Sequence, residues 1–133
     1  MTSAVFPKAK ERSLGAGLDL ANADVRVMLV LSSYTYDSTD EFVADLGAVD
    51  NGRSAALGSK TLTNGVFDAA DSTLNATAGT ASNALIVFIH TGADATARLI
   101  AYIDNAVGLP FTPEAAQTCP IVWDNGANKI FAL

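Results

Sequence analysis

The sequence is poor in the residues that carry most protein chemistry. Its 133 residues include one cysteine and one histidine. One cysteine excludes an internal disulfide and a cysteine-rich metal site, and one histidine excludes a two-histidine metal site. The chain also lacks the Gly-x-Ser-x-Gly sequence of a hydrolase and a glycine-rich phosphate loop followed by lysine. We therefore expect a protein without a catalytic site, a metal or a cofactor.

Basic residues and long apolar runs are also scarce. The formal net charge is −6 and the pI is about 4.4, so the surface should repel a phosphate backbone and we expect no nucleic-acid partner. The longest run of large apolar residues, Ala84 to Ile89, is far too short to cross a bilayer. The first residues do not show a basic segment followed by an apolar one, so we expect synthesis in the cytoplasm without a signal peptide.

The apolar residues that are present are gathered in short runs typical of strands. Residues 25–31 are apolar on one face and mostly apolar on the other, and residues 84–89 are continuously apolar, as expected of central strands, while residues 98–104 alternate in side-chain direction as the next strand. Residues 47–60 are predicted to be a loop or a weak edge strand, residues 60–63 and 66–68 a hairpin, and residues 72–77 a further strand. A final hairpin is predicted to turn at Asp124-Asn125-Gly126 and run to the last residue. The sequence thus predicts one mainly β domain over residues 1–133, an antiparallel β-sandwich or jelly-roll-like barrel of about seven or eight strands.

One short helix is predicted over residues 38–46. Ser38 could cap it, and Glu41 three residues later would complete a capping box. Phe42, Val43 and Leu46 would share one side, and Gly47 would end the helix. We expect this helix to close one end of the β fold.

The first sixteen residues are predicted to form an N-terminal arm, extended or weakly helical after Pro7. Three of the eight basic residues, Lys8, Lys10 and Arg12, lie within it. They form either a solvated terminal segment or a surface that binds an acidic partner.

The remaining candidate groups each have a structural and a functional interpretation. Cys119 is expected to be a packed thiol and His90 a strand-end residue. Acidic residues at 37, 40, 41 and 45 would favour the positive end of the helix dipole, or hold calcium, although the spacing is not that of an EF-hand. Tyr34 and Tyr36 should project to the same side after a strand, as a contact pair for sugar or for protein.

The order of the segments along the chain resembles a family of small virion proteins of tailed bacteriophages. The segments that carry the resemblance are Val25–Thr35, Thr39–Phe42, Thr61–Thr63, Phe67–Asp71, Leu85–Val87, Thr91-Gly92, Leu99–Asp104, Trp123-Asp124 and Ile130-Phe131. The resemblance covers about residues 8–133. It implies a non-enzymatic structural protein of the virion, of the capsid decoration (cement) or head-fibre type, assembled in the bacterial cytoplasm.

That resemblance sets the functional expectations. The first is a capsid decoration protein that binds the major capsid protein and sister copies as a homo-oligomer, possibly a trimer. The second is a tail or head–tail connector component, such as a ring-forming adaptor. A carbohydrate- or host-binding module, motivated by Tyr34 and Tyr36, is the third, and a hydrolase using His90 is the fourth. The expected contact residues are Lys8, Lys10, Arg12, Tyr34 and Tyr36.

Overall fold

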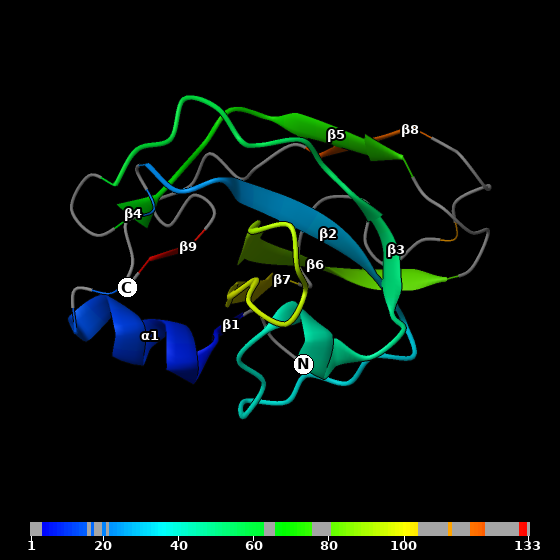
Figure 1. Ribbon diagram of the computed structural model, residues 1–133. Coiled ribbons are helices and arrows are strands. Elements are labelled where there is room, and N and C mark those ends of the chain that lie inside the picture. The colour runs from blue at the N-terminus through cyan, green and yellow to red at the C-terminus, as the bar shows by residue number, and fades with distance from the viewer. Residues whose placement is uncertain are drawn as a thin grey trace.

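The computed structural model is mainly β, as predicted (Figure 1). It describes residues 4–15, 17, 20, 22–62, 66–75, 81–103, 112, 118–121 and 131–132. The strands are β1 (Ala4–Val5), β2 (Val25–Leu31), β3 (Asp50–Arg53), β4 (Val66–Phe67), β5 (Ser72–Asn75), β6 (Ser82–Ile89), β7 (Leu99–Ile103), β8 (Thr118–Ile121) and β9 (Phe131–Ala132). The helices among these residues are α1 (Pro7–Leu14) and a 3-10 turn, η1 (Val43–Leu46).

A five-stranded antiparallel sheet in the order β1-β7-β6-β2-β3 forms the centre of the fold. Its inner strands β2 and β6 are the apolar runs that were predicted to be central, and the third inner strand, β7, lies in the run that was predicted only to be a strand. All five residues of β7 are buried, and so are Ala84 to Phe88 of β6. Burial of these residues on both faces of the sheet is the main stabilising contribution to the fold.

The smaller strands pair outside this sheet. β5 pairs with β8 and β4 pairs with β9, both antiparallel. The bridge between Ser54 and Leu74 joins the continuation of β3 to β5. The predicted hairpin over 60–68 is confirmed as a narrow bridge, in which Thr61 and Asp68 exchange two backbone hydrogen bonds of 2.9 and 3.0 Å.

The predicted final hairpin differs from the observed pairing. Its turn at 124–126 lies outside the described residues, and the strands before and after it, β8 and β9, pair with β5 and β4. Local turn chemistry suggested that the last two strands pair with each other, but each has a partner from an earlier part of the chain.

The predicted helix over 38–46 is wrong in length and in its cap. Only Val43–Leu46 is helical, and it is a 3-10 turn. Residues 41–43 instead run beside β7, because Leu99 N–H donates to the Glu41 carbonyl and Val43 N–H donates to the Ala97 carbonyl. This strand-like pairing prevents a helix from starting at Ser38. Gly47, with φ of 78°, ends η1 as predicted.

The expected N-terminal arm lies against the protein's own sheet from Ala4 to Leu14. β1 pairs with β7 through Ala4–Tyr102 and Val5–Ala101. Figure 1 shows α1 following β1 along the lower edge of the molecule. The part of the arm that the structure describes is therefore an element of the fold.

Candidate contact surface

The helix α1 presents the basic residues that the sequence singled out. Phe6, directly before it, is extended, with φ of −60° and ψ of 132°, and Pro7 takes the first turn, where its missing N–H costs nothing. The helix ends at Gly15, whose N–H donates to the Glu11 carbonyl over 3.1 Å. The sequence therefore starts and stops α1 within eight residues.

Two apolar side chains hold α1 against the sheet. Phe6 is fully buried, and its N–H donates to the Ile100 carbonyl of β7 over 2.9 Å. Ala9, one turn into the helix, is also buried. Because both attachments are to the core, α1 holds a fixed orientation relative to β7.

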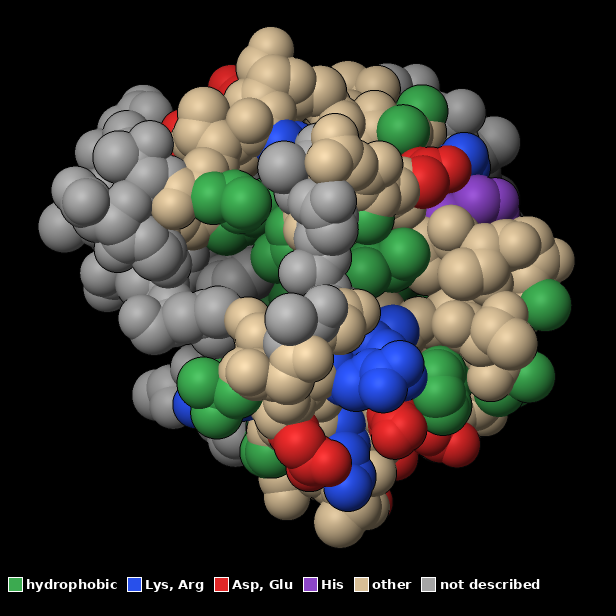
Figure 2. All heavy atoms as spheres, turned by 60° about the vertical axis from the view of Figure 1, so that its left-hand side comes forward, with side chains coloured by type: hydrophobic (Ala, Val, Ile, Leu, Met, Phe, Trp, Pro, Cys, Tyr) green, Lys and Arg blue, Asp and Glu red, His purple; other side chains and the backbone are tan. Residues whose placement is uncertain are grey.

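The outward side of α1 is basic and carries one large apolar side chain. Lys8, Lys10 and Arg12 are exposed, and Leu14 is 91% exposed. The single acidic residue, Glu11, lies 3.5 Å from Lys8 Nζ, and no ion pair to Lys10 or Arg12 occurs within the described ranges. Figure 2 brings the side of the molecule with α1 forward and shows basic, acidic and hydrophobic side chains next to one another on its lower part. A cationic helix ending in an exposed leucine is suited to a contact with an acidic partner.

Tyr34 and Tyr36 do lie together, but within the protein. Tyr34 is only 7% exposed, and its ring centroid lies 6.0 Å from that of Tyr102. The Tyr36 ring lies between Tyr102, at 5.3 Å, and Phe6, at 5.2 Å. Tyr34 is thus a buried residue, and Tyr36 is partly buried against the core, so the two rings belong to an aromatic row that ends at the base of α1. The expected contact pair offers a partner at most the exposed part of Tyr36.

An acidic segment adjoins this row of rings. We call residues 37–45 the acidic loop; it contains Asp37, Asp40, Glu41 and Asp45 and no basic residue. Tyr34 Oη donates to Asp40 over 2.8 Å, and the Asp45 carboxylate accepts the N–H groups of Glu41 and Phe42 at 3.0 and 2.9 Å. Asp37 accepts the Thr39 N–H and hydroxyl. These carboxylates therefore stabilise the loop, with Asp45 in the capping-box role that was expected of Glu41.

The environment of the acidic loop changes the pKa values in it. Burial raises the pKa of Asp40, although the Tyr34 hydrogen bond opposes this. Hydrogen bonds from Thr39 lower the pKa of Asp37. Burial also raises the pKa of Tyr34 above its ordinary value.

The calcium interpretation has no support in the part of the chain that the structure describes, where no three His, Cys, Asp or Glu side chains are grouped for a metal ion.

The other predicted groups lie away from α1. His90 follows β6, as predicted, and its N–H donates to the Asp24 carbonyl over 2.8 Å. Cys119 is in β8, and its side chain lies outside what the structure describes. No helix among the described residues is long and apolar enough to span a membrane.

Leu14 is the large exposed apolar residue on α1 that sequence reasoning did not single out. The signal was available, because Leu14 is five positions after the buried Ala9, which places it about 140° around a helix of 3.6 residues per turn. A leucine so placed on a helix of eight residues cannot reach the face that Ala9 buries.

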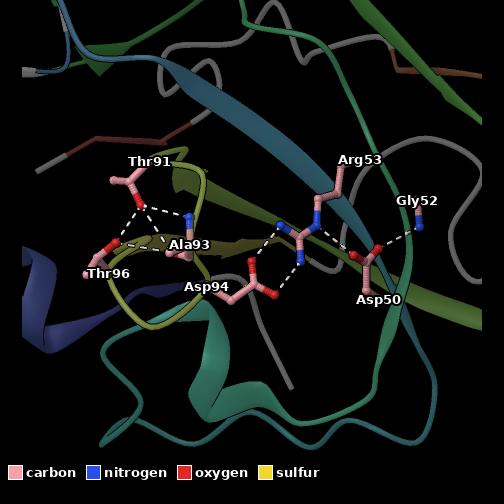
Figure 3. A network of polar contacts seen from close by, with 7 residues as sticks. All are labelled: Asp50, Gly52, Arg53, Thr91, Ala93, Asp94 and Thr96. Atoms are coloured by element: carbon pink, nitrogen blue, oxygen red, sulfur yellow. Dashed lines mark hydrogen bonds and ion pairs between the residues drawn. The ribbon is translucent and has the colours of Figure 1, made fainter.

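A second polar network fixes the loop after β6 to the edge strand β3 (Figure 3). The Arg53 guanidinium donates to both oxygens of Asp94 at 2.9 Å and to Asp50 at 2.6 Å, and it lies 5.4 Å from the Phe88 ring centroid. The Arg53 hydrogen bonds lower the pKa of Asp94 below its ordinary 3.8. Thr91 and Thr96 close the same loop with a hydroxyl contact of 2.6 Å.

The Asp94–Arg53 pair predicts a pH dependence of stability. Because the folded pKa of Asp94 is lowered, its contribution is complete above 3.8 and is lost as the pH falls through the folded pKa. Asp94 is half exposed, so we expect Asp94→Asn to cost less than about 1 kcal/mol near neutral pH and to reduce the loss of stability on acidification. Urea denaturation over a pH series measures both effects. In an Arg53→Met background, Asp94→Asn should no longer alter the acid limb; an unchanged effect there would contradict the pairing.

Comparisons with known proteins give no relative for this chain. No protein-family model, no curated protein and no solved structure matches it.

Proposed function

We propose that the protein is a non-enzymatic structural protein of a tailed-bacteriophage particle, a capsid decoration protein that binds the head shell and its own sister copies and stabilises the shell. The observation that carries the proposal is α1, a basic, exposed helix held by Phe6 against a buried strand. A helix fixed in this way binds a partner without first having to become ordered, so less conformational entropy is lost on contact. The ordered resemblance of the segments to small phage virion proteins supports the viral setting.

The mainly β fold is consistent with this function. A decoration protein needs a rigid domain that exposes a contact surface and survives outside the cell. The core of five paired strands provides rigidity, and α1 provides one exposed surface for a protein partner. Of the aromatic pair that motivated a glycan-binding module, Tyr34 is buried and Tyr36 partly buried, which disfavours a sugar-binding platform there.

Purified particles test the proposal. Particles assembled from the genome that encodes the chain should contain it at a copy number comparable to that of the major capsid protein. Particles assembled without it should release their DNA at a lower temperature. A copy number of a single ring would favour the connector alternative, and its absence from purified particles would overturn the virion assignment.

A further inference from the structure

The charge of the chain is divided unevenly between α1 and the rest of the protein. α1 has three basic residues and one acidic residue, a net charge of +2, while the whole chain carries −6. The remaining residues therefore carry −8. The rest of the sequence is thus acidic on balance, which favours attraction between α1 and another copy.

The nearest concentration of that acidity adjoins α1 itself. Residues 34–50 contain five carboxylates and no lysine or arginine. Two of the five already pair with arginines outside this segment, Asp50 with Arg53 at 2.6 Å and Glu41 with Arg98 at 3.7 Å, so the acidity offered to a partner comes from Asp37, Asp40 and Asp45 of the acidic loop. The Phe6 ring, at the start of α1, lies 5.2 Å from the ring of Tyr36, directly before the loop. Figure 1 places α1 and η1 on the same lower side of the central sheet. A basic element and an acidic element are thus neighbours on one side of the molecule.

Neighbouring patches of opposite charge are self-complementary under a twofold rotation. The rotation brings the helix of one copy against the loop of the other, and the same contact forms a second time. Leu14, two positions after Arg12 and 91% exposed, would be shielded from water at such an interface.

We propose that α1 binds the acidic loop of a second copy, so that the protein forms a twofold dimer through this charged side of the molecule. This inference deepens the proposed function, because it names a sister copy as the partner of α1. The biological role of the dimer rests on the proposed function. The shell would then be bound by another surface. Exposed ion pairs are screened by salt, so the dimer should weaken as ionic strength rises.

The charge of residues 34–50 can be reduced from −5 to −1 without removing the structural carboxylates. Thr35, Ser38, Ala44 and Ala48 are exposed, and none of their side chains makes a hydrogen bond described above. A loop variant with lysine at these four positions changes the charge of the segment while Asp37, Asp40 and Asp45 keep their bonds. A helix variant, Lys10→Glu with Arg12→Glu, makes α1 acidic and retains the Lys8–Glu11 pair.

Sedimentation equilibrium of the isolated protein at low and high ionic strength tests the proposal. We expect the wild type to dimerise at low ionic strength, and the dissociation constant of the helix variant to rise about tenfold or more, because each substitution acts twice across a twofold contact. The matched control, Lys10→Arg with Arg12→Lys, should dimerise as the wild type does. Thr73→Lys on β5, which Figure 1 places at the opposite side of the molecule, should also have no effect.

Mixing the two variants tests the twofold geometry. In a dimer of the helix variant, each acidic α1 faces an acidic loop and the two copies repel each other. In a dimer of the loop variant, each native α1 faces a loop that no longer attracts it. A dimer of one helix variant and one loop variant retains one native contact between α1 and the acidic loop. A mixed dimer more stable than either homodimer is therefore expected. A monomeric wild type at low ionic strength, a helix variant with wild-type association, or no preference for the mixed dimer would overturn the proposal. None of these results depends on a phage particle, so they are distinguishable from failure of the proposed function.

Discussion

Asn51→Asp is expected to destabilise the protein by about 3–5 kcal/mol near neutral pH, because it places an unpaired charge in the interior. Asn51 is fully buried in the edge strand β3, and its Nδ2 donates to Ser82 Oγ over 3.0 Å. Ser82, at the start of β6, is fully buried as well. The substitution keeps the shape of the side chain while it removes the donor and adds a carboxylate.

The pH dependence of this variant identifies the cause. Burial should raise the pKa of the new carboxyl above its unfolded value, so the penalty is largest at neutral pH and shrinks as acidification protonates the group. Urea denaturation of the wild type and the variant near neutral pH and at a pH of about 4 measures this change. Ser82→Ala serves as the control, with an expected cost of about 1 kcal/mol and no such pH dependence. Equal costs for the two variants at both pH values would show that Asn51 is not held in a buried polar contact.

Phe6→Ala is expected to cost about 3–5 kcal/mol and to release α1 from the sheet. The Phe6 side chain is fully buried directly before α1, and within α1 itself the only buried side chain is the small Ala9. Without the phenyl ring, the eight residues of α1 are too few to remain helical on their own in water. Hydrogen exchange should then become fast at the amides of α1 while the inner strands remain protected.

Leu14→Ala is the matched control for this second prediction. It also removes a large apolar side chain from the N-terminal segment, but that side chain is 91% exposed, so we expect a change within about 0.5 kcal/mol. Trypsin provides a second measurement, because release of the segment would make Lys8, Lys10 and Arg12 readily cleaved in the Phe6 variant only. Slow exchange of α1 in Phe6→Ala would mean that β1 and Ala9 suffice to hold the segment.

The inner strands β2 and β6 were predictable because strands that are apolar on both faces are stable only inside a sheet that is covered on both sides. Residues 84–89 are continuously apolar, and a run of that length is buried on both faces wherever it is placed. The same holds for residues 25–31, whose two faces are both mostly apolar. The class of the fold, mainly β, followed from these runs and the turns between them.

The helix at 38–46 was not predictable because two structures compete for the same residues. The local sequence favours a capped helix, and only the carbonyl and amide groups of residues 97–99, more than fifty positions away, draw residues 41–43 into an extended pairing.

A distant partner also decides the structure at Asn51. Asp50-Asn51-Gly52 has the composition of a turn, yet Asn51 is buried in a strand because Ser82 supplies a partner.

By itself the sequence determined the class of the fold, the three inner strands, the basic character of residues 8–12 and the scarcity of reactive groups, since each depends on composition or on short-range periodicity. Tertiary structure decided which residues face solvent. It buried Tyr34, partly buried Tyr36, left Leu14 exposed, and joined α1 to the acidic loop through Phe6 and Tyr36. The physical reason is that exposure depends on which distant segments pack together, as Tyr102 packs against Tyr34 and Tyr36.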